Sequence, residues 1–531
     1  MKKFQELNFG FADAINYKRR ENKQFFNSLF IKDYHLDKIC EPNISFLIGE
    51  KGTGKTAYSI YLSNNHYKNH YATTKYIRET DYATFIKLKK ENHLTISEFT
   101  SIWKVIILLL VSKQVIDNEK DNILSKLFNY NKFSVIQDVI EEYYYSAFNP
   151  EIGQAISFAE QSKIAAELLS KIAVLKGEES SQKNFTENRL QLNLFYIQKK
   201  FEEGLSQLKL NTNHIIFIDG IDIRPHNIDF DSYLDCIRGL GNAIWELNND
   251  FFPSIKGSKG RLRAVMLIRP DIFESMGLHN QNTKIRDNSV YLDWRTEYGS
   301  YRNSMLFEVI DHLFSSQQDN KTFKKGEAWN LYFPWDTPNV NIPLTTPSSF
   351  IYLLRWSYYR PRDILTLLSI LQENLKNSSE KTQITFSDIE DANFKRKYSN
   401  YLLGEVKDQL SFYYTLDDYE LFLKFFDFLS GMDKFNYDFY STAYNKLIGH
   451  IESLNKEIPQ FMATKNDFLQ FLFDLNIICY IETGESDNKR HFHWCFKDRS
   501  YSNISPKVKT HVEYEIFYGL AKALNVGRKV K

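Results

Sequence analysis

The segment from Gly49 to Thr56 contains the residues with the most specific chemistry in the chain. It fits the pattern G-x-x-x-x-G-K-[ST] of a phosphate-binding loop at each required position. Its glycines allow the backbone N–H groups to close around an anion, while Lys55 offers a mobile charge to the β- and γ-phosphates. The Thr56 hydroxyl is a ligand for Mg²⁺. The residues predicted to bind nucleotide here are Gly49, Glu50, Lys51, Gly52, Thr53, Gly54, Lys55 and Thr56.

A strand and a helix are predicted on the two sides of this loop. Residues 44–48 form a short apolar run typical of a buried strand, and residues 58–62 continue with a helical pattern. The helix would add the partial positive charge of its N-terminus to the anion site. The alternative is an ordinary glycine-rich turn before a helix. The complete motif in a strand–loop–helix context favours the phosphate loop.

A second predicted strand, at residues 214–218, leads directly into an acid. Asp219 follows four consecutive apolar residues, which places it at the carboxyl end of a buried strand, where ligands collect in an open α/β sheet. We expect Asp219 to hold Mg²⁺, directly or through water, and Asp222 to polarise the attacking water. The alternatives are that Asp219 ends an ordinary strand and that Asp222 caps the next turn.

Two arginine-containing segments are further candidates for the site. Arg269 lies in the predicted buried strand that starts at Arg263, directly after its apolar residues 264–268, where it could sense the γ-phosphate or pair with Asp271 or Asp219. Arg360 and Arg362 stand at the start of a predicted helix that has proline at an early position. A helical lid could carry these cations over the nucleotide, or they could pair with acidic neighbours.

The composition is that of a large globular protein whose positive and negative charges nearly balance. Of its 531 residues, 43% are hydrophobic and 15% aromatic, and the net charge is +1. Any nucleic-acid binding therefore needs a local basic patch. The N-terminus has no apolar signal core, and the apolar run at 105–111 is too short to span a bilayer and predicts a buried helix. From this we expect no contact with a membrane. The four cysteines are far apart in the sequence, which favours a reduced, cytoplasmic protein; they are Cys40, Cys236, Cys479 and Cys495.

Periodicity divides the chain into four predicted parts. Alternating strand and helix patterns, including candidate strands at 82–88 and 289–294, predict an α/β domain with a mostly parallel sheet. The parts are an N-terminal arm (1–42), a P-loop ATPase domain (43–345) with a helical insertion at about 95–210, a helical lid (346–400) and a C-terminal domain (401–531).

The C-terminal part has the pattern of a winged helix. Helical stretches precede two alternating runs joined by a polar turn (477–496), which predict a β-hairpin. His491, His493 and Cys495 would share one face of the second run, and Cys479 on the partner strand could complete a metal site. Ordinary strand alternation explains this spacing better.

The motifs together resemble a bacterial family of P-loop ATPases related to the STAND and origin-recognition branches of the AAA+ class. The segments that carry the resemblance are Gly49–Thr56, Asp219–Asp222, Leu267–Asp271 and Arg360–Asp363, with further similarity at residues 9–14, 292–294, 493–498 and 519–524. The resemblance implies an AAA+-like nucleotide domain, a helical lid and a winged-helix-like module. It also implies ATP and Mg²⁺ as ligands, with Lys55 and Thr56 on phosphate and metal, Asp219 on metal and Arg362 at the lid sensor position.

One departure from the family pattern bears on the rate of turnover. Gly220 follows Asp219, where vigorous AAA+ hydrolases have the glutamate that activates water. This fits a slow switch, with Asp222 as a candidate substitute.

Three functions are compatible with these residues. The favoured one is a nucleotide switch that acts through homo-oligomerisation or a separate effector protein, and several relatives of the family serve in bacterial anti-phage defence. The second is an ATP-driven loader or motor that contacts DNA through the winged helix. The third is an assembly scaffold that binds nucleotide with little turnover.

Overall fold

The described part of the chain forms two compact units in a computed structural model. It comprises residues 1–77, 96–118, 198–199, 201–224, 228–319, 322–335, 348–376, 381–484 and 489–527. The parallel-sheet unit consists of Lys32–Glu50 and Lys55–Leu292. The C-terminal unit consists of Met1–Ile31, Lys51–Gly54 and Asp293–Lys531. The arm predicted over residues 1–42 is thus divided between the units after residue 31.

The parallel-sheet unit is built on five parallel strands in the order β2-β3-β4-β1-β5. The strands are β1 (Phe46–Ile48), β2 (His70–Tyr76), β3 (Asn213–Asp219), β4 (Leu262–Ile268) and β5 (Ser289–Tyr291). The central strands β1 and β4 are buried at every residue, as strands covered on both faces must be. The mostly parallel sheet predicted from the alternating pattern is confirmed.

The register of the sheet brings three sequence motifs to one edge. Met266 of β4 pairs with Phe46 of β1 on one side and with Ile218 of β3 on the other. The carboxyl ends of these three strands are therefore level within about one residue. The loop after β1, the acid that ends β3 and the arginine after β4 all lie at this edge.

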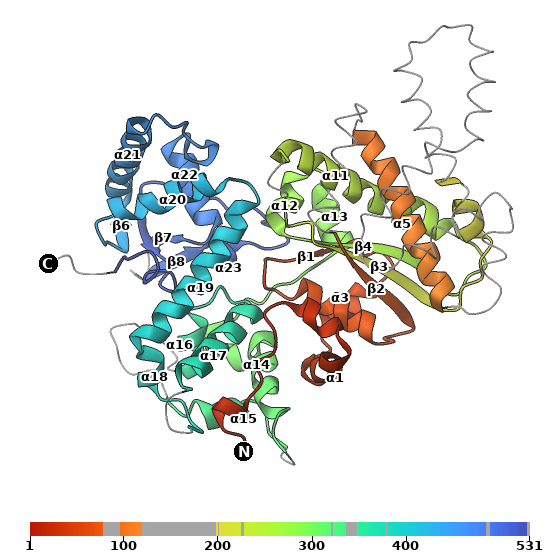
Figure 1. The fold of residues 1–531 in the computed structure, drawn as a ribbon, viewed down its shortest axis with the longest axis horizontal. Coiled ribbons are helices and arrows are strands. Elements are labelled where there is room, and N and C mark those ends of the chain that lie inside the picture. Colours follow the sequence, from red (N-terminus) through yellow and green to blue (C-terminus); the bar gives the residue numbers. More distant parts are fainter. Residues whose placement is uncertain are drawn as a thin grey trace, which may run out of the picture. The chain divides into compact units, whose positions relative to one another are not determined.

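Helices cover both faces of the sheet. Figure 1 shows α3 (Lys55–Asn64) on one face and α5 (Ile96–Asn118) with α11 (Phe230–Glu246) on the other. This follows from right-handed crossovers, because β1–α3–β2 and β3–α11–β4 run in opposite directions along the sheet. The buried helix predicted around residues 105–111 is confirmed within α5. The shorter helices are α2 (Tyr34–Ile39), α12 (Pro270–Ser275) and α13 (Gln281–Asn288).

The second strand of the sheet, β2, lies in a segment for which no strand was predicted. The candidate strand at 82–88 and most of the helical insertion lie outside the described residues. The described β2 occupies His70–Tyr76 at the sheet edge and mixes threonine, lysine and tyrosine, with only His70 and Thr74 fully buried. An edge strand of this composition lacks the apolar run that marks β3 and β4.

Several helices of the C-terminal unit pack against its N-terminal segment. Phe4 lies among aromatic rings of α14, α15 and the residue after it, and Gln372 of α17 donates to the carbonyl of Leu7 at 2.7 Å. As predicted, α17 begins at the proline that follows Arg360. The helices are α1 (Arg20–Leu29), α14 (Met305–Ser315), α15 (Glu327–Tyr332), α16 (Ser349–Leu354), α17 (Pro361–Asn374), α18 (Phe386–Glu390), α19 (Ala392–Ser411), α20 (Leu416–Phe428), α21 (Tyr437–Ser453), α22 (Lys465–Asp474) and α23 (Cys495–Asp498).

An antiparallel sheet in the order β6-β9-β7-β8 completes this unit. Its strands are β6 (Lys434–Asn436), β7 (Ile478–Thr483), β8 (Arg490–Trp494) and β9 (Glu513–Ile516). The predicted hairpin is confirmed as β7 and β8. Cys495 opens the short helix α23 instead of continuing β8, so it does not share a strand face with His491 and His493. Within the described ranges, no three metal-ligating side chains come together.

None of the described helices has both the length and the apolar composition that a bilayer-spanning helix requires.

A buried arginine joins the start of the parallel-sheet unit to its centre. Arg263 of β4 donates to the carbonyls of Ile39 (2.7 Å), Ile44 (3.2 Å) and Glu41, and so caps the end of α2 just before β1. Burial lowers the pKa of Arg263 to about 10, and the nearby Cys40 and Glu41 offset part of this effect. The hydrogen bonds thus stabilise a cation whose burial is itself unfavourable.

Replacing Arg263 with methionine is expected to lower the free energy of unfolding by about 2–4 kcal/mol, because buried carbonyls lose their donor. Denaturant titration of Arg263→Met measures the effect. Arg261→Met is the matched control, since Arg261 is exposed two residues earlier. Equal stability of the two variants would contradict the capping role.

Candidate functional site

The loop from Gly49 to Thr56 adopts a conformation that depends on its glycines. Gly52 has a φ of +88° and Gly54 a φ of +96°, values that residues other than glycine rarely adopt. The loop leaves β1 at Gly49, whose N–H donates to the carbonyl of Ile268 at 3.1 Å, and enters α3 at Lys55. The predicted strand–loop–helix arrangement is therefore present in the structure.

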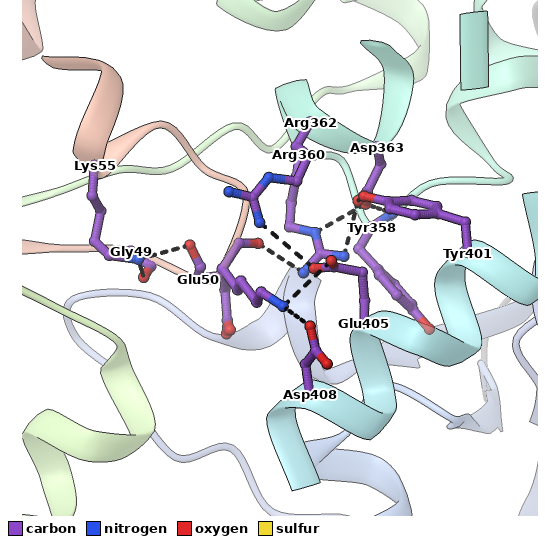
Figure 2. A network of polar contacts seen from close by, with 11 residues as sticks. Gly49, Glu50, Lys55, Tyr358, Arg360, Arg362, Asp363, Tyr401, Glu405 and Asp408 are labelled. Atoms are coloured by element: carbon purple, nitrogen blue, oxygen red, sulfur yellow. Dashed lines mark hydrogen bonds and ion pairs between the residues drawn. The ribbon is translucent and has the colours of Figure 1, made fainter. Parts of the chain in front are cut away.

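The Lys55 ammonium folds back onto the start of the same loop. Its Nζ donates to the carbonyl of Gly49 at 2.8 Å and to that of Glu50 at 3.1 Å, and the side chain is buried (Figure 2). The residue thus brings a positive charge close to the loop backbone.

Asp219 reaches the beginning of α3 from the end of β3. Its Oδ2 accepts from the Thr56 hydroxyl at 2.6 Å and its Oδ1 accepts from the N–H of Gly220 at 2.8 Å. The two side chains, 163 positions apart in the chain, are the pair that was predicted to hold a metal. Both offer hard oxygen atoms, the ligand type that Mg²⁺ prefers.

The electrostatics of Asp219 favour a cation beside it. Burial raises the pKa of this carboxyl, and so does the negative charge of Asp222, while hydrogen bonds from Thr56 and Gly220 and the charge of Lys55 act in the opposite direction. The net shift is upward, so the ionised form is costly in the metal-free protein. A divalent cation at the paired oxygens of Thr56 and Asp219 would relieve this cost, and the two residues therefore fit Mg²⁺.

Asp222 lies on a turn that a tyrosine holds in place. The Tyr233 hydroxyl of α11 contacts the carbonyls of Ile221 (2.9 Å) and Ile223 (3.0 Å), on either side of the half-buried Asp222. No sequence pattern singles out Tyr233, which occupies one of the buried positions of the amphipathic helix α11. Its contacts fix the backbone that carries Asp222.

The structure explains why glycine follows Asp219. Gly220 has a φ of +87°, and a Cβ atom there would lie 2.4 Å from the carbonyl oxygen of Ile77. A glutamate at this position would be both strained and in collision with the backbone after β2. The absence of the water-activating glutamate is therefore a consequence of the local backbone.

Arg269 is paired with an acid of its own segment. This side chain is 1% exposed, with Nε 3.1 Å from Oδ1 of Asp271 and a terminal nitrogen 2.5 Å from Oδ2. Of the alternatives that the sequence left open, the structure contains the pairing with Asp271. Such a two-point contact fixes the plane of the guanidinium at the carboxyl edge of β4.

The tip of the loop, Lys51–Gly54, belongs by its contacts to the C-terminal unit. Arg360 donates to the carbonyl of Lys51 at 2.8 Å and grips both oxygens of Asp363 at 2.9 Å each (Figure 2). Burial would lower the pKa of Arg360, but Asp363 and Glu405 outweigh it and raise the pKa. Arg360 is thus a fixed, charged donor to the loop backbone.

Arg362 and Lys51 share an acid on α19. The Arg362 guanidinium lies 3.8 Å from Glu405, and its backbone N–H donates to the carbonyl of Gly52 at 3.3 Å. Lys51 Nζ lies 3.4 Å from the same Glu405 and 2.5 Å from Asp408. The pairing with acidic neighbours, which the sequence left open as the alternative to a cation over the nucleotide, is therefore present for both Arg360 and Arg362.

Trp294 makes a contact with the loop that the sequence did not reveal. Its indole Nε1 donates to the carbonyl of Thr53 at 2.9 Å, and the side chain is 8% exposed. Leu292–Trp294 contributed to the family resemblance, but no pattern linked this tryptophan to a loop 241 positions earlier in the chain.

One family model matches part of the chain. Residues 305–407 match the FunZ-associated C-terminal helical domain. The match contains Arg360, Arg362, Asp363 and Glu405, and it ends one residue before Asp408. No curated protein shows significant similarity to the chain.

Replacing Asp219 with asparagine is expected to raise the melting temperature of the metal-free and nucleotide-free protein at pH 7 by a few degrees. The native pKa lies above that of the unfolded chain, so the native state loses stability as the pH rises from about 4 and the carboxyl ionises. The gain should shrink towards pH 4. Asparagine can still accept from Gly220 and donate to Thr56.

Thermal melts between pH 4 and pH 8 measure this difference. Asp250→Asn, which changes an exposed acid of the same unit, is the control and should show no such trend. A lower melting temperature of Asp219→Asn at pH 7 would show that the native fold stabilises the charged form.

Gly220→Ala is expected to lower the free energy of unfolding by at least about 2 kcal/mol, because positive φ and the collision with Ile77 act together. Gly257→Ala is the matched control, since Gly257 has a φ of +78° and nothing within 4 Å of the added Cβ. Denaturant titration compares them. Equal losses would mean that the backbone after β2 moves away at little cost.

Proposed function

We propose that the chain is a Mg²⁺-dependent, ATP-binding switch of the P-loop class that hydrolyses ATP slowly. The observation that carries the proposal is the 2.6 Å contact between the Thr56 hydroxyl and the buried Asp219 carboxylate. This contact joins the last residue of a complete phosphate-loop motif to the acid at the carboxyl end of β3. The strand order, in which β4 separates β1 from β3, is compatible with an AAA+-like nucleotide domain.

Each residue of the site has a distinct role in this proposal. The backbone N–H groups of the loop bind the phosphate oxygens, and Lys55 moves part of its contact from the carbonyls of Gly49 and Glu50 to the β- and γ-phosphates. Thr56 and Asp219 hold Mg²⁺, which neutralises charge that develops on the phosphate oxygens. Catalysis here is mostly positioning and charge stabilisation.

The proposed slow turnover rests on the absence of a strong general base next to Asp219. Gly220 cannot be replaced by glutamate without strain, and Asp222 is the acid that remains near the metal-binding carboxylate. We assign to Asp222 the orientation of the attacking water. Arg269 and Arg362 remain candidates for phosphate contacts, since a triphosphate could compete for the Arg362 guanidinium with Glu405.

We further propose that the nucleotide state is transmitted through a homo-oligomer or a separate effector protein. The family resemblance supports a role in bacterial anti-phage defence, and the helical-domain match includes Arg360 and Arg362, which contact the loop tip. A scaffold with little turnover is the second candidate, and Gly220 favours it. A DNA-binding loader has less support, because Arg490 of the predicted hairpin pairs with Glu513, and Lys509 pairs with Glu482 of the same hairpin.

Lys55→Ala is expected to weaken binding of Mg·ATP by about tenfold to a hundredfold, because charge-assisted contacts to phosphate are lost. Equilibrium titration with a fluorescent ATP analogue measures the dissociation constant. Lys259→Ala, which removes an exposed lysine of the same unit, is the control. Equal affinity of the two variants, or no affinity of the natural protein for any triphosphate, would refute the proposal.

The variant Asp219→Asn distinguishes the role of the metal site from binding of the nucleotide. It should reduce Mg²⁺-dependent hydrolysis more than it reduces binding of ATP measured without metal. Hydrolysis equal to that of the natural protein across a Mg²⁺ titration would remove Asp219 from the metal site. The scaffold would be favoured if Asp219→Asn and Asp222→Asn keep their biological activity while Lys55→Ala loses it.

A further inference from the structure

Three consecutive carbonyl groups at the loop tip accept hydrogen bonds from the rest of the C-terminal unit. The donors are the Arg360 guanidinium to Lys51 (2.8 Å), the backbone N–H of Arg362 to Gly52 (3.3 Å) and the Trp294 indole N–H to Thr53 (2.9 Å). All six residues belong to one unit. The tip is therefore held along its backbone, one peptide group after another.

The direction of these carbonyls fixes the direction of the neighbouring N–H groups. In a trans peptide, the N–H of the next residue points opposite to the C=O, and none of the described residues has a cis peptide bond. The N–H groups of Gly52, Thr53 and Gly54 therefore point away from the three donors. These are the amides that a phosphate loop directs at its anion.

We propose that Trp294 and Arg360 are positioning residues for anion binding. By holding the carbonyls of Thr53 and Lys51, they turn the amides of Gly54 and Gly52 towards the side of the loop on which a phosphate would bind. The ligand is a nucleoside di- or triphosphate, so this inference rests on the proposed function. Neither side chain needs to touch the nucleotide.

The donor on Arg360 is itself fixed by a second layer of contacts. Asp363 holds the guanidinium at two points and also accepts from the N–H of Tyr358 at 3.0 Å and the hydroxyl of Tyr401 at 3.2 Å. Tyr359, directly before Arg360, has a φ of +56°, which is unfavourable for an aromatic residue. Its N–H donates to the Ser357 hydroxyl at 3.1 Å, which supports this turn.

The donor on Trp294 is fixed by burial. The indole is packed within the C-terminal unit, and an indole has a single N–H, so its one donor has one possible direction once the ring is placed. The loop tip is thus ordered before any ligand binds. Such pre-organisation improves affinity because less conformational entropy is lost on binding.

The test replaces Trp294 with phenylalanine, which removes the donor and keeps an aromatic ring. Trp329→Phe is the matched control, because Trp329 is also buried in this unit and donates to the Ser349 hydroxyl at 3.0 Å, away from the loop. Hydrogen exchange at the amides of Gly52, Thr53 and Gly54 is measured without nucleotide. Affinity for Mg·ATP is measured with the fluorescent analogue.

Trp294→Phe should speed exchange at these amides and weaken Mg·ATP binding about three- to tenfold, the size expected for one neutral hydrogen bond. Trp329→Phe should change neither, even if its melting temperature falls. Arg360→Lys keeps the charge but cannot hold Asp363 at two points, so it should also speed exchange and weaken binding.

Exchange and affinity of Trp294→Phe equal to those of Trp329→Phe would overturn the inference. If the natural protein binds no triphosphate, the proposed function fails by itself. The exchange comparison without nucleotide still decides whether Trp294 and Arg360 order the loop, so the two failures are distinguishable.

Discussion

The 49–56 loop must hold two glycines at positive φ while the carbonyl groups of residues 49–53 find donors, and much of the surrounding structure meets this requirement. Lys55 satisfies the carbonyls at the start of the loop, and donors of the C-terminal unit satisfy those at its tip. A loop held only by its own sequence would sample many conformations, because glycine loses much entropy on ordering. The site therefore depends on long-range contacts as well as on the motif.

Charge is distributed differently in the two parts of this region. Around the loop tip, cations and carboxylates are paired, as in the contacts of Lys51 with Asp408 and of Arg360 with Asp363. At the edge of the parallel sheet, Asp219 is buried beside a second acid, and its ionised form is disfavoured. The first arrangement gives a fixed geometry, whereas the second has a charge that a bound cation would neutralise.

Local patterns were sufficient to predict the core of the sheet and the residues at its edge. The apolar runs of β3 and β4 and the motif after β1 each lie within a few consecutive residues, so periodicity and spacing reveal them. The contact of Trp294 with Thr53, the turn held by Tyr233 and the pairing of Lys51 with Asp408 depend on where distant segments meet. No periodicity encodes that meeting, and the polar edge strand β2 escaped prediction because it lacks an apolar run.

The discontinuous make-up of the C-terminal unit has a consequence for biosynthesis. The ribosome completes Lys51–Gly54 early, but their partners Trp294 and Arg360 are translated 241 and 309 positions later. A nascent chain can thus contain every strand of the parallel sheet and still lack the groups that order the tip of its own loop. Competence to bind ligand would then mature only after Arg360 has been translated, which ties it to synthesis of the C-terminal unit.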